Sequence, residues 1–276
     1  MFQKLKFVLV CGLGICALSA NALDVATYNL KHGQGNDNVV DLARPTAIIA
    51  DLGVDLVALQ EMDLANDRTG FVNQPAKIAY DLSNTHQKGN WKSLAAPAIA
   101  FKGGHYGNAI IYNADKLTLK QYEVVSLPES ENGDGARSAG IALFEIDGKP
   151  FQFIASHLTH RNEPTATGSY QLDEINLIER HLDKQLPTIF AADFNASIRP
   201  EDQHRNLTTM QKLPEKGWRI DSTLTGQSEP DKPWIIDYIL SKNNDGLKVK
   251  ESLILVNDAT NLASDHYPVK VSYAVK

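Results

Sequence analysis

Short apolar runs that end in a polar cluster recur along the chain. They are rich in β-branched and aromatic residues, which is typical of β-strands, and polar or turn-forming residues separate them. We expect strands over Leu23–Leu30, Asp55–Gln60, Tyr106–Tyr112, Arg137–Ile146, Phe151–His157, Thr188–Asn195, Ile235–Leu240, Leu247–Val256 and Val269–Ala274.

Four stretches between these runs have the pattern of helices: Pro45–Leu52, Ala76–Leu82, Ser169–Leu186 and Asp202–Leu213. In the third stretch, apolar residues recur at helix-like intervals, at Leu172, Ile175, Leu177, Ile178 and Leu182. Strands outnumber helices. The pattern therefore predicts an α/β protein whose core is two packed sheets flanked by helices, rather than a simple doubly wound sheet.

The first 22 residues have a different character. Lys4 and Lys6 precede an apolar stretch that runs from Phe7 to Ala20, and small residues at Ala20 and Ala22 match the positions that a signal peptidase reads. A membrane anchor is the alternative, but a span needs about 20 apolar residues, and this run has only 14. We therefore expect residues 1–22 to be a signal peptide and the mature protein to be secreted or periplasmic.

The composition of the rest, residues 23–276, is that of an ordinary globular protein. The whole chain is 43% hydrophobic and 22% charged, and no internal repeat or long linker divides it, so we expect one domain and a monomer. Both cysteines, Cys11 and Cys16, lie in the signal segment. The mature chain would therefore contain no disulfide and no thiol nucleophile. We also expect no transmembrane segment in it.

The charge balance bears on the choice of partner. Without the first 22 residues, which carry two lysines and no acid, 25 basic residues face 33 acidic ones, a net charge of −8. Non-specific binding of nucleic acid depends on Lys and Arg that neutralise phosphates, and no basic run is present. The sequence therefore carries no strong signal for nucleic-acid binding, although a nuclease that works through a bound metal stays an alternative.

Residues that can bind a metal or transfer a proton gather where the predicted strands begin or end. They are Asn29, Glu61, Asn108, His157, Asp193, Asn195, Asp237, Asp265 and His266. Each alone is explained by a turn, a helix cap or a solvated strand end. Polar groups at strand ends can, however, converge on one rim of a sheet sandwich, so the whole set predicts a single site there.

Five segments in a fixed order carry a family resemblance: Leu59-Gln60-Glu61, Ser156-His157-Leu158, Ala192-Asp193-Phe194-Asn195, Ile236-Asp237-Tyr238-Ile239 and Ser264-Asp265-His266. Together with Asn29 they resemble the motifs of the endonuclease/exonuclease/phosphatase superfamily, which includes deoxyribonuclease I. The resemblance extends over residues 23–276. It implies a four-layer α-β-β-α sandwich with two mixed, mostly antiparallel sheets, and metal-dependent hydrolysis of phosphoester bonds.

The resemblance also implies a metal site. Glu61, Asn29 and Asp265 would bind Mg²⁺, with Mn²⁺ as an alternative, and oxygen donors of this kind suit such hard cations. Lys31 departs from the pattern, because some members have an acidic or amide residue at that position. The number of metal ions therefore stays open.

Catalytic roles follow from the same resemblance. His266 would be the general base, with Asp237 orienting its imidazole, although Asp193 is the alternative base. Asp193 and Asn195 would position the attacking water and the phosphoryl group. The phosphoryl oxygens would accept hydrogen bonds from His157, Asn108 and Arg137.

A further motif, Asp67-Arg68-Thr69-Gly70 followed by Gln74, comes soon after Glu61. It resembles a feature of secreted bacterial members of the superfamily, and we assign Arg68 to substrate binding on that basis. A glycine-containing turn with a solvated arginine explains the same residues equally well.

Taken together, these features predict an exported Mg²⁺-dependent phosphodiesterase or phosphatase. The acidic surface and the lack of an aromatic-rich hairpin favour a phosphoester substrate that is a small molecule or a lipid headgroup. A secreted nuclease is one alternative. The other is a non-catalytic binding protein that has retained the fold.

Overall fold

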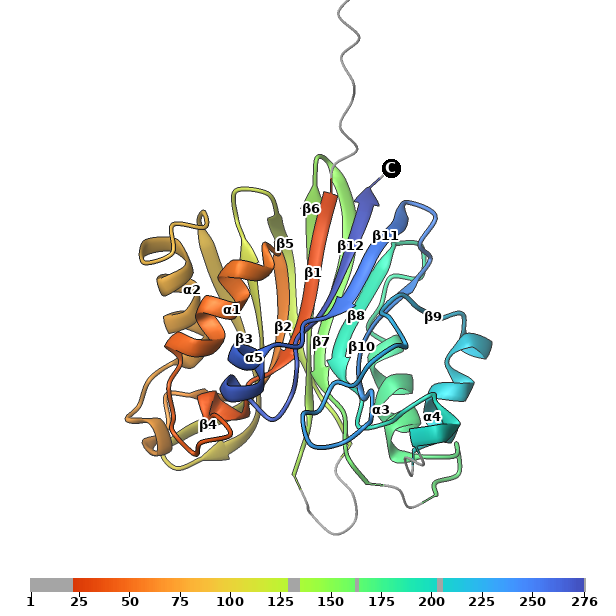
Figure 1. Cartoon of the computed structure of the whole chain (residues 1–276). Helices are drawn as coiled ribbons and strands as arrows, with labels where there is room; N and C mark the ends of the chain where they lie inside the picture. Colours follow the sequence, from red (N-terminus) through yellow and green to blue (C-terminus); the bar gives the residue numbers. More distant parts are fainter. Residues whose placement is uncertain (1–21, 129–134, 162–163, 203–205, 276) are drawn as a thin grey trace, which may run out of the picture.

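The computed structural model describes residues 22–128, 135–161, 164–202 and 206–275. Two six-stranded sheets pack against each other (Figure 1). The first has the order β11, β12, β1, β2, β4, β3, with bounds Leu247–Ile254, Val269–Val275, Ala22–Asn29, Leu56–Leu64, Gly104–Asn113 and Trp91–Phe101. The second has the order β5, β6, β7, β8, β10, β9, with bounds Thr118–Ser126, Ser138–Ile146, Lys149–His157, Thr188–Asp193, Asp237–Lys242 and Arg219–Ile220.

Each sheet is mixed. The β1–β2 pair of the first sheet and the β7–β8 pair of the second are parallel, and the other strand pairs of the described residues are antiparallel. This confirms the two mixed, mostly antiparallel sheets that the resemblance implied.

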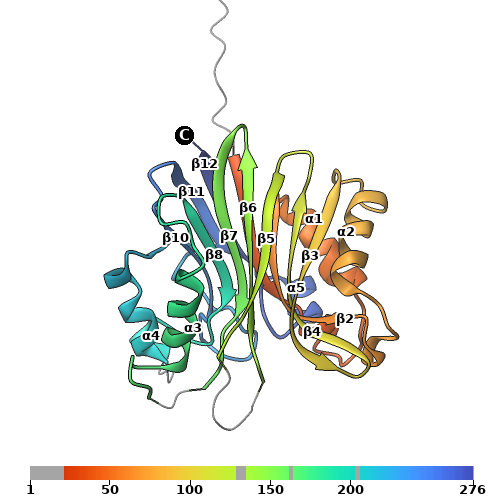
Figure 2. The same cartoon turned by 180° about the vertical axis from the view of Figure 1, so that it is seen from behind.

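Helices cover the outer face of each sheet, which makes four layers (Figure 2). On the first sheet they are α1 (Ala43–Leu52), α2 (Gln74–Asn84) and α5 (Asp258–Ala263); on the second they are α3 (Tyr170–Glu179) and α4 (Leu207–Lys212). Short 3₁₀ turns lie at Lys31–Gly33, Asp67–Thr69, Pro200–Asp202 and Pro214–Lys216. None of the helices in the described residues is long and apolar enough to span a membrane.

Alternation along the strands divides the core into three apolar layers. In β1, Val25 faces the other sheet whereas Ala26 and Tyr28 face the helices, because successive side chains of a strand point to opposite faces. Aromatic rings join the two sheets: Tyr112 of β4 lies 4.9 Å from Phe144 of β6, measured between ring centroids. Each sheet is therefore buried on both faces, by the other sheet and by its helices, which fits the long apolar runs in the central strands.

All nine predicted strands are present, within a few residues of the expected ends. The prediction was wrong in omitting β3, β5 and β9, which are all edge strands, and the short helix α5. The helix expected over Ser169–Leu186 ends at Glu179. Of the described residues in the helix expected over Asp202–Leu213, Leu207–Lys212 are α-helical, and residues 203–205 lie outside the described part of the chain. The predicted signal peptide lies outside the described residues except for Ala22, which begins β1.

Candidate active site

The strand register brings three of the predicted residues together. On the second sheet, Asp193 at the end of β8 pairs with His157 of β7 on one side and with Asp237 of β10 on the other. Directly paired residues on neighbouring strands project from the same face of a sheet. The first sheet contributes Asn29 and Glu61 from the same end of the sandwich, the lower edge in Figure 1.

Glu61 sits on an irregularity in β2. The pairing of β2 with β4 shifts between Leu59 and Met62. The backbone of Glu61 has φ +59°, a left-handed conformation that residues other than glycine rarely adopt. Because of this bulge, the side chain of Glu61 does not follow the regular alternation of side chains along the strand. Strained backbone of this kind concentrates at functional sites.

Asn29 connects the two sheets across the site. Its Nδ2 donates to Glu61 Oε1 and to Asp193 Oδ2, at 3.1 Å each. Its Oδ1 accepts from the backbone N–H of Lys31 at 3.1 Å, and its backbone oxygen accepts from Ser264 Oγ at 2.7 Å. In this orientation Asn29 presents its amide nitrogen, not its oxygen, to the carboxylates.

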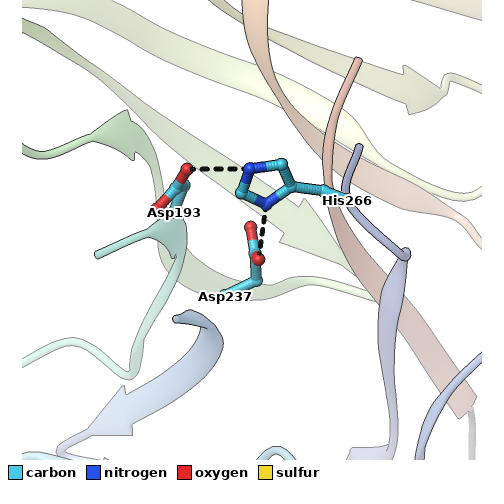
Figure 3. A group of neighbouring side chains, drawn as sticks. All are labelled: Asp193, Asp237 and His266. Atoms are coloured by element: carbon cyan, nitrogen blue, oxygen red, sulfur yellow. Dashed lines mark hydrogen bonds and ion pairs between the residues drawn. The ribbon is translucent and has the colours of Figure 1, made fainter. Parts of the chain in front are cut away.

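His266 lies between two carboxylates of the second sheet (Figure 3). Its Nδ1 is 2.8 Å from Asp237 Oδ2, whereas its Nε2 is 3.9 Å from Asp193 Oδ2, beyond hydrogen-bonding distance. All three side chains are at least nine-tenths buried. The close contact with Asp237 fixes the ring so that Nδ1 carries a proton and Nε2 faces Asp193.

Burial and charge act in opposite directions on the protonation of this group. Burial alone would lower the pKa of His266, but the carboxylates of Asp237 and Asp193 raise it well above the usual value. Burial, and then the charge of Asp237, raise the pKa of Asp193 to about 7. Both shifts have the same origin, because two buried carboxylates around one imidazole favour retention of a proton. The imidazole is the group that holds it, since Asp193 also accepts hydrogen bonds from Asn29 and from the backbone N–H of Asn195.

His157 has the opposite environment. Its Nε2 lies 2.8 Å from Asn195 Nδ2 and 3.3 Å from Asp193 Oδ2, and its Nδ1 lies 3.4 Å from Arg137 Nη1. Burial, and then the guanidinium of Arg137, lower the pKa of His157 well below the usual value. The ring is therefore neutral. Asn195 Nδ2 can only donate, so the unprotonated Nε2 accepts from it.

A cavity of about 230 Å³ opens beside these groups. Its polar lining comes from Glu61, Tyr106, Asn108, Arg137, His157 and His160. Asn108 is oriented by donating from Nδ2 to Ser138 O at 2.9 Å, and Arg137 Nη2 lies 3.5 Å from His160 Nδ1. The cavity lining thus contains both a carboxylate and a guanidinium.

Two predicted residues lie apart from this constellation. Asp265 is 40% exposed in its side chain and is paired with Lys31, its Oδ2 lying 2.8 Å from Lys31 Nζ. Arg68 does not line the cavity, and its guanidinium is bound to Asp63. The other nine predicted residues lie together at the lower edge of the sandwich.

Sequence reasoning missed two residues of the site, Tyr106 and Ser264. Tyr106 lines the cavity, and burial and the neighbouring Glu61 raise the pKa of its hydroxyl. A signal for it was present, because Tyr106 stands two residues before Asn108 on one strand and so shares its face. Ser264 was noted only as part of a motif, and nothing in the sequence indicated that its hydroxyl would hold the backbone of Asn29.

The donors at this edge suit a hard divalent cation. The carboxylates of Glu61, Asp193 and Asp237 supply oxygen ligands, and Asp237 Oδ1 is buried with no hydrogen-bond partner among the described residues. Ligand atoms of Asp193, Asp237 and His266 all lie within 4.8 Å of one another. Mg²⁺ needs only one or two protein carboxylates together with water and substrate phosphate. Glu61 and Asp193, both hydrogen bonded to Asn29, are the pair that fits this requirement while His266 stays with Asp237.

The fold has many counterparts among solved structures. An endonuclease/exonuclease/phosphatase from Beutenbergia cavernae is 20% identical, with a TM-score of 0.73, over 92% of this chain and 72% of that one. A mannosyl-6-phosphatase from Bacteroides thetaiotaomicron is 20% identical, with a TM-score of 0.62, over 90% and 98%. The catalytic domain of human Nocturnin, with a bound sulfate, is 16% identical, with a TM-score of 0.65, over 92% and 94%.

At the level of sequence, no curated protein matches the chain. Residues 26–266, which include all the predicted site residues, match the Endonuclease/Exonuclease/phosphatase family. The order of motifs, the sandwich and the convergence of the strand ends agree with that match. The chain is a member of the endonuclease/exonuclease/phosphatase family.

Proposed function

We propose that the protein is an exported, Mg²⁺-dependent hydrolase of a phosphoester in a small molecule or a lipid headgroup. Family membership supports phosphoester hydrolysis in general. The observation that carries the proposal is the His266–Asp237 pair beside Asp193. Asn29 joins Asp193 to Glu61, which lines the same cavity as Arg137. These are the parts that a metal-assisted attack of water on phosphorus needs.

The protein's own groups would divide the work. His266 Nε2 makes no hydrogen bond with a described residue and would accept the proton of the attacking water, while Asp237 holds Nδ1 protonated. Before that step the imidazole must be neutral, so the carboxylates around it must be partly neutralised. Mg²⁺ held by Glu61 and Asp193 would supply that positive charge and polarise the phosphoryl oxygens.

Arg137 and Asn108, which line the same cavity as Glu61, would hold the phosphoryl group. The guanidinium of Arg137 carries a permanent charge and can donate to two non-bridging oxygens. Neutral His157 and Asn195 hold each other and the backbone of Leu158, so they would fix the position of Asp193 and of the water. No step needs a thiol or a redox cofactor.

The size of the cavity supports a small substrate. A volume of about 230 Å³ is below that of most ligand pockets, roughly 300–1,000 Å³. It suits a phosphoryl group with a small substituent. The net acidic surface argues further against a dedicated nucleic-acid groove.

The first test is Glu61→Gln, which replaces a carboxylate by a neutral amide of the same shape. We expect a higher Mg²⁺ requirement and lower activity with an unchanged fold, because an amide is a poorer ligand for a hard cation. The measurement is the rate of nitrophenol release from a bis-nitrophenyl phosphodiester against Mg²⁺ concentration. Full activity at an unchanged Mg²⁺ optimum would exclude Glu61 from the site.

The substrate class is tested with a panel of nucleic acid, sphingomyelin, phosphatidylinositol and sugar phosphates, each with Mg²⁺ and with EDTA. We expect turnover of a small or headgroup phosphoester that EDTA abolishes. Preferential cleavage of nucleic acid would make the protein a nuclease instead. Binding of a phosphoester without turnover would favour the non-catalytic alternative.

Export is tested separately by the N-terminal residue of the protein made in its native host. The lysine-flanked apolar segment before Ala22 leads us to expect cleavage after that residue. Intact Met1 on cytoplasmic protein would overturn the proposed export.

A further inference from the structure

The motif at Asp67–Thr69 surrounds a buried carboxylate instead of facing the cavity. Asp63 of β2 is completely buried. Its Oδ2 accepts from Arg68 Nε at 3.0 Å and from Thr69 Oγ1 at 3.1 Å, and its Oδ1 accepts from Arg68 Nη2 at 2.6 Å. The paired contact from Arg68 is the bidentate geometry that only a guanidinium can give.

Gln74 completes the same arrangement from α2. Its Oε1 accepts from the backbone N–H of Asp63 at 2.8 Å, and its Nε2 donates to the backbone oxygen of His32 at 2.7 Å. Gln74 is itself fully buried. It therefore joins the end of β2 to the turn that carries Lys31, the residue paired with Asp265.

The other side of Arg68 touches the cavity wall. Its Cζ lies 4.8 Å from the ring centroid of Phe101 and 5.1 Å from that of Tyr106. Tyr106 lines the cavity next to Glu61. Arg68 therefore supports two parts of the site at once, the β2 strand through Asp63 and Tyr106 through its ring.

Glu61 needs such support. Its left-handed backbone is unfavourable for a residue with a side chain and persists only where the surroundings hold it. Asp63 stands two residues further along the same strand, with every oxygen of its carboxylate hydrogen bonded. Fixing Asp63 fixes the end of the bulge from which Glu61 projects.

We propose that Asp63, Arg68 and Gln74 form a positioning brace that holds Glu61 and Tyr106 in place for cation binding. Arg68 acts in it through Asp63 and Tyr106 and does not touch the substrate. This inference rests on the proposed function only in taking Glu61 as a metal ligand. It assigns the motif at Asp67–Thr69 and Gln74 to metal affinity.

The decisive variant is Arg68→Met, with Arg44→Met as its control. Arg44 pairs with Asp37 in an exposed ion pair on the same side of the protein, at 2.9 Å, and has no contact with the brace. Isothermal titration with Mg²⁺ alone should give a Kd that is higher for Arg68→Met by about 10-fold or more, the usual effect of losing a group that helps to orient a metal ligand. Arg44→Met should bind Mg²⁺ as the wild type does. Arg68→Lys should fall between, because lysine keeps the charge but not the paired hydrogen bonds.

Kinetics on the bis-nitrophenyl phosphodiester separate a brace from a substrate contact. A brace predicts that excess Mg²⁺ restores the activity of Arg68→Met with an unchanged KM for the phosphodiester. A raised KM together with an unchanged Mg²⁺ Kd would instead place Arg68 on the substrate and overturn the inference.

Amide hydrogen exchange over residues 60–64 tests the brace without any metal. We expect faster exchange in Arg68→Met and Gln74→Leu than in Arg44→Met, because the bulge loses its support. Unchanged exchange in both variants would overturn the brace even if the protein proved inactive on every substrate. If Arg68→Met fails to fold, Thr69→Val removes one hydrogen bond to Asp63 and serves in the same measurements.

Discussion

Two fully buried carboxylates at the same edge of the sandwich, Asp63 and Asp237, have different partners. Asp63, on the first sheet, accepts three hydrogen bonds, two of them from Arg68. Asp237, on the second sheet, contacts His266 through one oxygen, and its other oxygen has no hydrogen-bond partner among the described residues. Both oxygens of Asp63 are therefore hydrogen bonded, whereas Asp237 has one oxygen that can still accept a hydrogen bond or bind a cation.

The partners differ in whether they can release a proton. A guanidinium stays charged in proteins, so the pair of Asp63 with Arg68 is permanent. Burial alone would raise the pKa of Asp63, but the hydrogen bonds and charge of Arg68, together with the hydrogen bond from Thr69, outweigh it and lower that pKa. An imidazole can release its proton near neutral pH. The first pair is therefore suited to holding geometry, and the second to moving a proton.

The largest effect should come from breaking the titratable pair. We expect His266→Ala and Asp237→Asn each to lower kcat by about 10²–10⁴-fold, the usual contribution of general-base catalysis. The double variant should be little worse than the worse single one, because the two residues act as a unit. The measurement is kcat at saturating Mg²⁺ and substrate, together with the melting temperature of each variant.

His181→Ala is a suitable control for this experiment. His181 also contacts a carboxylate, with its Nδ1 3.3 Å from Glu123 Oε2, but on the exposed surface away from the site. It should leave kcat unchanged. If His266→Ala retains activity, or if the two single effects multiply in the double variant, Asp193 becomes the better candidate for the base.

Removing each carboxylate should also change the free energy of unfolding, and this effect should be smaller than the effect on kcat. Asp63→Ala leaves a half-buried guanidinium that cannot lose its charge, and we expect a loss of about 2 kcal/mol, below the roughly 3–5 kcal/mol for breaking a fully buried pair. Asp237→Ala leaves an imidazole that becomes neutral, and we expect a loss below about 1 kcal/mol, since active-site groups often cost stability. Urea unfolding in EDTA measures both, and equal losses would contradict the distinction between the pairs.

The central strands and the polar residues at their ends could be predicted from sequence because their signals are local. Asp193 follows an apolar run, Ile189–Ala192, that must be a buried strand, and the same holds for His157 after Phe153–Ala155. Strand ends then bring such residues together without any detailed knowledge of the packing. The three omitted strands are all at sheet edges, where one side lacks a neighbour and the apolar pattern weakens. In β5 most side chains are at least partly exposed, so no alternation was visible.

The position of Arg68 could not be predicted for a different reason. Its partner Asp63 lies in a polar stretch, Gln60–Asp63, where the bulge at Glu61 interrupts the alternation of β2. Sequence spacing gives no warning that a strand bulges. The same holds for Asp265, whose neighbour Lys31 adopts a left-handed backbone with φ +45°. Both are contacts set by backbone geometry and not by residue pattern.

A third buried carboxylate, Glu174 on α3, makes no ion pair with the described residues and sharpens the comparison further. Its Oε2 accepts from the backbone N–H of Thr159 at 2.9 Å, and its Oε1 has no partner among the described residues. Burial raises the pKa of Glu174 to about 8. Burial outweighs the hydrogen bond from Thr159 and the charge of Arg137, so this carboxyl group keeps its proton at neutral pH.

This makes stability depend on pH in a defined direction. Because the pKa of Glu174 is higher in the folded state than its ordinary value of 4.5, its contribution is fully present below about pH 4.5 and is lost as pH rises toward 8. Glu174→Gln cannot ionise. The stability of the wild type relative to this variant should therefore fall by roughly 2 kcal/mol between pH 5 and pH 7. Urea unfolding of both proteins in EDTA at the two pH values measures the difference, and parallel pH profiles would show that Glu174 is ionised inside the folded protein.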